Sequence, residues 1–225
     1  MGEVTKRIIS GVIMAGLLLG DLWMGAGWFT ALLAVGAVIL WREYARMIWN
    51  GWHSSRARLL WVIFGLAYFG AAIFGLWRAR NTEDGFFIAM LLFGVVWATD
   101  IGAYVSGRAI GGPKIAPSIS PSKTWAGFAG GSGAVMLVVV GALWWKLDLP
   151  PTRWNIYLPA CLVACVLIAA VAQAGDFFES WLKRRAGMKD SGALIPGHGG
   201  LFDRVDGLLP VAIVFGIVVA WTLPG

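Results

Sequence analysis

The chain has 225 residues, of which 59% are hydrophobic and 13% are charged, and its mean hydropathy is +0.75. These values exclude an ordinary soluble domain and are typical of a membrane protein with several spans. The net charge of +6 is spread between apolar segments and not gathered in one patch, so it indicates anionic lipid headgroups and phosphates as partners, and no nucleic acid.

Apolar segments follow one another along the whole chain. The segments from the second to the sixth are about long enough to cross hydrocarbon some 30 Å thick. We therefore predict an all-α fold, a polytopic integral membrane bundle of about seven transmembrane helices in a single domain over residues 1–225. The expected segments are 8–20, 22–41, 59–77, 86–107, 125–145, 154–175 and 208–223.

The polar residues divide this domain into three parts. Residues 8–96 are mainly apolar N-terminal spans, 97–207 carry the polar motifs, and 208–223 form the last span. With seven crossings, fourteen of the eighteen Lys and Arg residues fall on the side of the N-terminus. Basic connections favour the cytoplasmic side, so this imbalance predicts that the N-terminus and the polar motifs face the cytoplasm. Residues 42–58 read as a basic loop on that side.

Asp100 interrupts the fourth expected span, and Tyr104 and Arg108 follow it on the same helix face. A carboxylate at that depth costs about 2.5–3.5 kcal/mol. Two interpretations are open. Asp100 either forms a wall of a polar site or pairs with Arg108 at the end of the helix.

The Gly-, Pro- and Ser-rich connection 108–124 ends immediately before the fifth expected span, and the stretch 118–127 reads SISPSKTWAG. Ser120, Lys123 and Thr124 gather hydroxyl groups and an ammonium group there. If a helix begins near Thr124, its free N–H groups and positive dipole end would favour an anion such as a phosphate. The alternative is that a Ser or Thr hydroxyl only caps the helix.

The most polar stretch, residues 175–207, reads GDFFESWLKRRAGMKDSGALIPGHGGLFDRVDG. Asp176, Glu179 and Lys183 are spaced to share one face of a helix. The Gly- and Pro-rich loop that follows allows its backbone to approach a ligand closely. Asp203 and Asp206 then add two carboxylates directly before the last span.

This stretch resembles the signature of the phosphatidate cytidylyltransferase (CDP-diacylglycerol synthase) family. Two further stretches are similar to that family, one beginning at Asp100 and one at Ser120, although Ala126 stands where the family has glutamate. The matching signature positions are Ser180, Lys183, Arg184, Lys189, Asp190, Ser191, Pro196, His198, Gly199, Gly200, Asp203, Arg204 and Asp206.

The resemblance implies transfer of a cytidylyl group from CTP to phosphatidic acid, which gives CDP-diacylglycerol and pyrophosphate in phospholipid biosynthesis. It implies Mg²⁺ as the cofactor, with K⁺ as a further candidate cation, and a homodimer. It also implies a bacterial inner (plasma) membrane location. Two anions must approach each other in this reaction, and a divalent cation is the general means of neutralising them.

The resemblance also implies roles for individual residues. Asp176, Asp203 and Lys183 are the expected catalytic residues, and Asp176 and Asp203 are the expected Mg²⁺ ligands. Asp190 and Asp206 could instead form loop salt bridges with Lys189 or Arg204, and His198 could merely order its loop. The expected phosphate contacts are Ser120, Lys123, Thr124, Arg184, Lys189, His198 and Arg204, and the expected supporting carboxylates are Asp100, Glu179, Asp190 and Asp206.

Other functions compete with this interpretation. One is a different CTP-dependent lipid-phosphate enzyme, because the acceptor pocket cannot be read from the sequence. Another is a cation or phosphate transporter whose pathway would include Asp100, Asp176 and Asp203. A transporter of that kind is often built from inverted repeats, and the sequence shows none. A catalytically inactive relative is a third possibility, suggested by Ala126.

Overall fold

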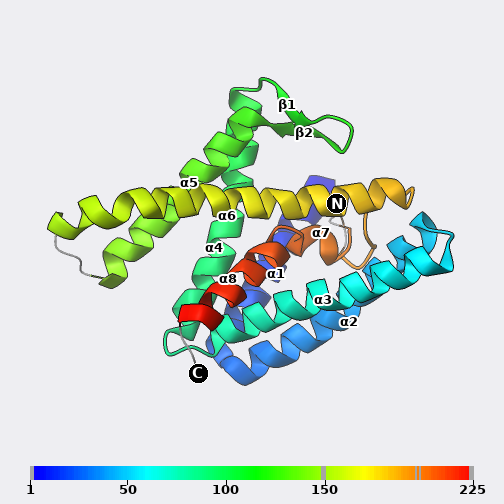
Figure 1. The fold of residues 1–225 in the computed structure, drawn as a ribbon, viewed down its shortest axis with the longest axis horizontal. Coiled ribbons are helices and arrows are strands. Elements are labelled where there is room, and N and C mark those ends of the chain that lie inside the picture. Colours follow the sequence, from blue (N-terminus) through cyan, green and yellow to red (C-terminus); the bar gives the residue numbers. More distant parts are fainter. Residues whose placement is uncertain (1–2, 148–150, 196, 198, 223–225) are drawn as a thin grey trace.

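The computed structural model describes residues 3–147, 151–195, 197 and 199–222. Within them the chain forms eight helices and one two-stranded antiparallel hairpin (Figure 1). The predicted all-helical membrane architecture is confirmed, apart from this short hairpin. The elements are α1 Glu3–Met24, α2 Ala26–Gly51, α3 Ser55–Arg80, α4 Gly85–Ala109, β1 Lys114–Ala116, β2 Ser120–Thr124, α5 Trp125–Leu147, α6 Pro151–Arg185, α7 Phe202–Val205 and α8 Leu208–Thr222.

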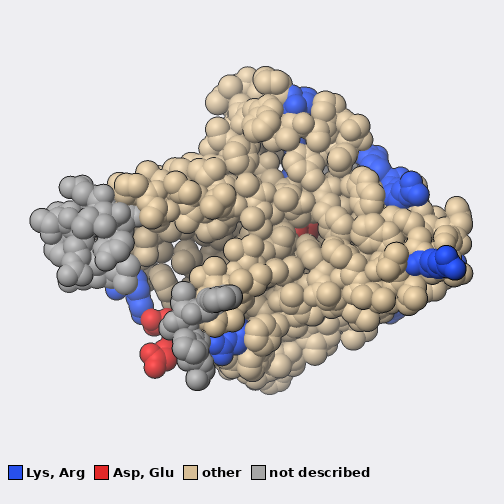
Figure 2. Space-filling model, viewed as in Figure 1, with Lys and Arg blue, Asp and Glu red and all other residues tan. Residues whose placement is uncertain are grey.

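Five of the described helices are long and apolar enough to cross a membrane, by length and composition. They are α2 to α6, and they correspond to the second through sixth predicted spans. Two shorter apolar helices, Ile9–Met24 within α1 and Leu208–Ala220 within α8, correspond to the first and the last. Most of the surface in Figure 2 carries neither acidic nor basic side chains, as a face in contact with hydrocarbon requires.

The helices pack around two apolar clusters. The first joins α1 to α6 and α8, and both Leu92 and Val135 are buried in it. The second lies between α2, α3, α6, α7 and α8 around Tyr44, Phe69 and Phe202. In Figure 1, α6 crosses the molecule in front of α4, while α2 and α3 run side by side. The end of α6 and α7 therefore rest on the pair formed by α2 and α3.

Glycine allows α4 and α5 to approach each other closely. A Cβ atom at Gly130 of α5 would lie 1.7 Å from Oγ of Ser106 and 2.9 Å from the backbone oxygen of Gly102. Small residues at helix contacts are the usual way in which membrane helices achieve dense packing. This contact brings Asp100 of α4 to the same side of the molecule as the start of α5.

Two predicted boundaries were wrong for a common reason. Residues 42–58 are not a loop, because α2 continues to Gly51 and α3 begins at Ser55. The sixth span does not end at Gly175, because α6 continues as one helix to Arg185 and has 35 residues. Such a helix is about 50 Å long and exceeds hydrocarbon about 30 Å thick. In both places the charged residues mark the end of the apolar stretch and not the end of the helix.

The connections gather at two ends of the bundle. The α2–α3 connection, the β1–β2 hairpin and the end of α6 lie toward the right and top of Figure 1. The α3–α4 connection, the end of α5 and the start of α6 lie toward the left and bottom. An ion pair of 2.6 Å between Lys146 and Asp84 joins the end of α5 to the α3–α4 connection. This arrangement is consistent with the predicted separation of basic and non-basic connections.

Candidate active site

Lys183 joins the polar face of α6 to α7. Its Nζ atom lies 2.5 Å from Oε2 of Glu179, one turn earlier on the same helix, and 2.6 Å from Oδ1 of Asp203 in α7. Glu179 is 1% exposed, so this ion pair lies inside the protein. The predicted common face of Asp176, Glu179 and Lys183 is consistent with these contacts. The fold brings Asp203 of α7 into contact with this face of α6 through Lys183.

The carboxylate of Asp203 is held from two sides. Lys183 donates to Oδ1, and the backbone N–H groups of Ser191 and Gly200 donate to Oδ2 at 2.9 and 2.8 Å. The hydroxyl of Ser191 also donates to Oδ2, at 2.8 Å. Gly199 precedes Gly200 with φ +82, and a Cβ there would lie 2.7 Å from the same oxygen. A glycine at this point therefore lets the backbone close around the carboxylate.

The carboxyl groups of Asp203 in α7 and of Asp206 directly after α7 differ in their pKa. Burial alone would raise the pKa of Asp203, but hydrogen bonds shared with Glu179, Lys183, Gly200 and Ser191 lower this pKa to about 2. Burial raises the pKa of Asp206 to about 6, and the nearby charge of Asp100 adds to this rise. Asp203 is therefore fully ionised near neutral pH, which suits a ligand for a cation.

Asp176 is paired with a different cation. Its Oδ2 atom forms an ion pair and hydrogen bond with Lys123, which comes from β2. The ammonium group of Lys123 also lies 5.2 Å from the ring centroid of Phe177. Asp176 and Asp203 are thus held by different lysines. β2 supplies the lysine that pairs with Asp176, and α7 supplies Asp203 to the pair with Lys183 of α6.

Asp100 faces the same charges from α4. The positive groups that act on it are Lys123 and Arg204. Arg108 instead donates to the hydroxyl of Tyr104 at 2.9 Å. No ion pair between described residues joins Asp100 to Arg108, so that alternative is wrong for the described part of the chain. A role of Asp100 as a wall of the polar site stays a prediction.

The hydroxyl of Thr124 caps α5. It accepts a hydrogen bond of 3.0 Å from the N–H of Gly127, and Thr124 is 2% exposed. Ser120 lies in the hairpin, where it pairs with Ala116. Of the two interpretations of this stretch, the structure thus shows the cap. A direct contact between phosphate and either hydroxyl stays a prediction.

The remaining sequence-predicted residues lie around the edge of this site. Arg184, Lys189, Asp190 and Arg204 are exposed. No ion pair between described residues involves Asp190 or Arg204, so the alternative of loop salt bridges to Lys189 or Arg204 is wrong for the described part of the chain. His198 and Pro196 lie outside the described residues.

Sequence reasoning missed Glu43. This residue of α2 is 8% exposed and accepts hydrogen bonds from the N–H groups of Leu201 and Phe202 at the start of α7, and its Oε2 atom lies 3.1 Å from the Ser191 hydroxyl. Glu43 falls within residues 42–58, which the sequence predicts to be a basic loop. The available signal was its spacing: Leu40, Glu43 and Met47 recur at the helical interval of a buried face.

The acidic side chains of the site carry oxygen atoms of the kind that a divalent cation prefers. Within the described residues no three His, Cys, Asp or Glu side chains form a complete metal cage. Mg²⁺ in nucleotide enzymes, however, commonly takes only one or two carboxylates and completes its shell with phosphate oxygens and water. Asp176 and Asp203 supply such hard oxygen atoms. Oε1 of Glu179 is buried without a hydrogen-bond partner, which leaves one more carboxylate oxygen near Lys183 for a cation.

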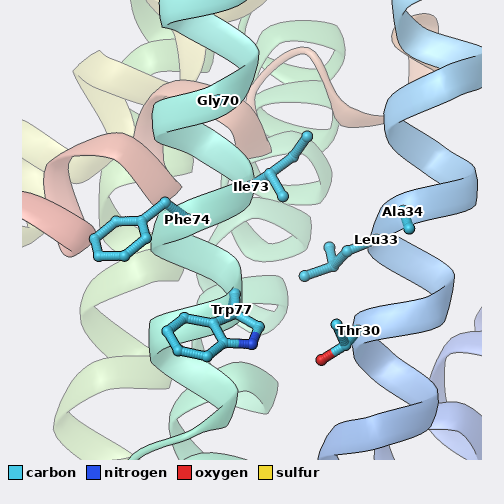
Figure 3. A pocket seen from close by; sticks show the side chains of 7 residues that line it. All are labelled: Thr30, Leu33, Ala34, Gly70, Ile73, Phe74 and Trp77. Carbon is cyan, nitrogen blue, oxygen red and sulfur yellow. The ribbon is translucent and has the colours of Figure 1, made fainter.

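A hollow elsewhere in the molecule is lined almost entirely by apolar groups. It lies between α2 and α3, has a volume of about 340 Å³ and is open to one side (Figure 3). Its lining offers almost no polar atoms, so it is unsuitable for a nucleotide or a metal ion. The lining residues are Thr30, Leu33, Ala34, Gly70, Ile73, Phe74 and Trp77.

Comparison with known proteins gives a consistent result. Residues 52–222 match the model of the cytidylyltransferase family. The phosphatidate cytidylyltransferase of Brucella suis is 43% identical over 194 residues, which cover 84% of this chain and 67% of that protein. That of Rickettsia typhi is 32% identical over 217 residues, 95% of this chain and 90% of its own. That of Haemophilus influenzae is 37% identical over 154 residues. The family match includes every site residue above except Glu43.

Proposed function

Because the chain belongs to the cytidylyltransferase family, we propose that it transfers the cytidylyl group of CTP to phosphatidic acid, with CDP-diacylglycerol and pyrophosphate as products. The chain is accordingly an integral membrane nucleotidyltransferase of lipid biosynthesis. The proposal depends on one observation, which combines the comparison with known proteins and the geometry of the site. The segment that matches the family is also the segment whose carboxylates and lysines converge between α4, β2, α6 and α7.

The chemistry needs little from a general base. The phosphate of phosphatidic acid is already an anion, and one of its oxygens forms a bond to the α-phosphorus of CTP while the bond to pyrophosphate breaks. The barrier is the approach of two anions, so positive charge in a partly dry site is the main requirement. Lys123 and Lys183 are held there by Asp176 and Asp203. We propose that both ammonium groups turn toward phosphate oxygens when the substrates bind.

We propose that Asp176 and Asp203 hold Mg²⁺ together with phosphate oxygens of CTP. When bound, the ion supplies neutralisation of the charge that develops on the phosphates. The Ser191 hydroxyl and the Ser191 and Gly200 N–H groups keep Asp203 in one orientation while Lys183 shares its other oxygen. K⁺ as a second cation and a homodimer are proposals that rest on the family resemblance alone.

We propose further that the site faces the cytoplasm from a bacterial inner membrane. The relatives are bacterial, the helices are apolar, and the basic connections lie at the end of the bundle that carries the site. Phosphatidic acid would reach the site from the membrane, and CTP would reach it from the aqueous side. The exposed Arg184 and Lys189 lie where anionic headgroups would pass.

The test is an acceptor comparison with purified protein in lipid–detergent micelles. CTP and Mg²⁺ are supplied with phosphatidic acid, with diacylglycerol or without added lipid, and products are identified by mass spectrometry. The proposal predicts CDP-diacylglycerol with phosphatidic acid alone. A product formed only from another acceptor would replace the substrate assignment. No product with any acceptor, from protein shown to be folded, would identify an inactive relative, and Ala126→Glu would then be the variant to examine.

A further inference from the structure

Glu43 is a buried carboxylate in a helix that carries no other acidic residue. It lies on the buried side of α2 with Leu40, Tyr44 and Met47, and it is 8% exposed. None of the ion pairs between described residues includes it. A charged group in such surroundings is costly unless its oxygens are hydrogen-bonded. The hydrogen bonds of Glu43 must therefore offset the cost of burying it.

These hydrogen bonds come from the loop before α7 and from the start of α7. The N–H of Leu201 donates to Oε1 at 2.9 Å, and the N–H of Phe202 donates to Oε2 at 2.8 Å. The hydroxyl of Ser191 lies 3.1 Å from Oε2. N–H groups in the first turn of a helix have no acceptor within that helix. Glu43 thus provides, from α2, the acceptors that α7 lacks, since Leu201 forms no side-chain cap.

The loop is shaped around this carboxylate. A Cβ atom at Gly200 would lie 2.5 Å from Oε1 of Glu43, and one at Gly192 would lie 2.6 Å from the same atom. Distances below 3.0 Å between a Cβ and a neighbouring heavy atom require something to move. A residue with a Cβ at either position would therefore require the Glu43 side chain to shift from its present place under the loop.

The same loop atoms hold Asp203. Ser191 lies between the two carboxylates, with its Oγ 3.1 Å from Oε2 of Glu43 and 2.8 Å from Oδ2 of Asp203. The N–H of Gly200 donates to Asp203, and the next two N–H groups along the chain donate to Glu43. Three consecutive backbone donors are thus divided between the two carboxylates. A change at Glu43 would displace the donors that orient Asp203.

We propose that Glu43 is a positioning residue for cytidylyl transfer, which acts through the Ser191 hydroxyl and the backbone at residues 200–202 to fix the orientation of Asp203. The effect on turnover rests on the proposed function, whereas the effect on the loop and on cation binding does not. The proposal also makes α2, which precedes the segment matched by the family, part of the site's framework.

The test compares Glu43→Gln with Glu83→Gln in the full-length protein. The first change keeps the side chain's size but replaces one acceptor oxygen with an NH₂ group that cannot accept from Leu201 or Phe202. The second makes the same change at an exposed glutamate of the α3–α4 connection. Three quantities are measured: binding of Mn²⁺ alone by electron paramagnetic resonance, hydrogen exchange of residues 200–203, and kcat and KM with phosphatidic acid.

For Glu43→Gln we expect Mn²⁺ binding at least tenfold weaker, since residues that orient ligands commonly contribute about 10–100-fold to metal affinity. We expect hydrogen exchange of residues 200–203 at least tenfold faster. We also expect kcat at least tenfold lower, with the KM for phosphatidic acid within twofold. Glu83→Gln should leave all of these within twofold of the unmodified chain.

Ser191→Ala provides the second arm, because it removes the hydroxyl between the two carboxylates and leaves Glu43 in place. It should also weaken Mn²⁺ binding at least threefold, and the double variant should bind Mn²⁺ less weakly than the product of the two single effects predicts. If Glu43→Gln does not fold, Ser191→Ala decides alone: Mn²⁺ binding at least threefold weaker would support the inference, and a smaller change would overturn it.

One result would overturn the inference. Glu43→Gln would bind Mn²⁺ and turn over within twofold of the unmodified chain while its unfolding temperature fell, and Glu43 would then serve stability alone. An unmodified chain without cytidylyl transfer would refute the proposed function instead. Mn²⁺ binding and hydrogen exchange would still decide the role of Glu43 in that case.

Discussion

Asp203 and Lys183 form an ion pair, and each of them also has other partners. Lys183 is shared between Glu179 and Asp203, while Asp203 also accepts hydrogen bonds from Ser191 and Gly200. Such networks make the protonation of one member a property of the whole group. The contribution of a single residue to such a network can therefore be tested by a change of pH as well as by substitution.

Asp203 should stabilise the folded protein in a defined pH range. Its pKa is lowered from 3.8 to about 2, where hydrogen bonds outweigh the effect of burial. A carboxyl group whose pKa is lower in the folded state adds stability above its unfolded pKa, and this stability is lost as the pH falls through the folded value. The contribution should be on the order of 2 kcal/mol above about pH 4 and should disappear between about pH 4 and pH 2.

The measurement is the unfolding midpoint of the purified protein with EDTA present, for the unmodified chain and for Asp203→Asn, between pH 2.5 and pH 6. The difference between the two should be largest at pH 6 and should shrink toward pH 2.5. A difference that does not change with pH would show that ionisation of Asp203 contributes nothing to stability.

At the scale of elements, Thr124 connects the hairpin to α5, and its hydroxyl caps the start of that helix. Thr124 ends β2 and accepts from the N–H of Gly127 in the first turn of α5. Thr124→Ala should therefore lower the free energy of unfolding by about 1 kcal/mol, as loss of an N-cap usually does. Ser122→Ala, at an exposed position of the same strand, is the control and should have no such effect.

Activity separates this cap from a phosphate contact. With the protein still folded, Thr124→Ala should keep kcat within about threefold, because the hydroxyl is engaged inside the protein. A kcat lower by a hundredfold at unchanged stability would contradict the cap as the main role of Thr124 and would support direct phosphate binding.

The close contact of α4 and α5 gives another prediction. Gly130→Ala places a methyl group against Ser106 and the backbone of Gly102, whereas Gly133→Ala, three residues later on α5, meets nothing within 4 Å. Overpacking of this kind costs about 1–3 kcal/mol. Gly130→Ala should lower the unfolding midpoint in detergent and Gly133→Ala should not. Equal effects of both variants would contradict the packing described for α4 and α5.

The elements also show how far sequence reasoning reaches. The apolar segments predicted every long helix, and helical spacing correctly placed Glu179 and Lys183 on one face, because both depend on local periodicity. Glu43 was missed because its partners, Ser191, Leu201 and Phe202, are about 150 residues away in sequence. No local pattern records which distant backbone groups a buried carboxylate will contact.

Helix ends and short strands were the other weak points. Hydropathy marks where an apolar stretch ends, but α2 and α6 continue as helices through the charged residues that follow their apolar stretches. The hairpin β1–β2 is short and rich in Ser and Pro, so its composition indicates a loop. The pairing of Asp176 with Lys123 depends on that hairpin and could not be derived from spacing.

The whole molecule has a direction in the membrane that can be tested. His53 lies in the α2–α3 connection and Glu83 in the α3–α4 connection, and both are exposed. Single cysteines at these two positions are introduced after Cys161 and Cys165 are replaced by alanine. In intact bacterial cells, a maleimide that cannot cross the membrane should label Glu83→Cys and not His53→Cys. The opposite pattern would place the active site outside the cytoplasm.

The same orientation concerns how the two proposed substrates would reach the site. The carboxylates and lysines gather around the C-terminal part of the 35-residue helix α6, whereas the almost entirely apolar hollow is lined by other residues, of α2 and α3. A water-soluble nucleotide and a lipid headgroup can both reach such a position. We therefore propose that the chemistry takes place at the boundary between membrane and water.

The most direct measurement of the central claim follows the α-phosphorus of CTP. Purified protein receives phosphatidic acid, Mg²⁺ and CTP labelled with ³²P at the α-position, beside Asp176→Asn, Asp203→Asn and the control Glu83→Gln. We predict that label enters lipid with the unmodified chain and with Glu83→Gln, and that both aspartate variants reduce transfer at least a hundredfold while remaining folded. Label that still enters lipid with both aspartate variants would contradict the site described here. Label that never enters lipid with the unmodified chain would contradict the function.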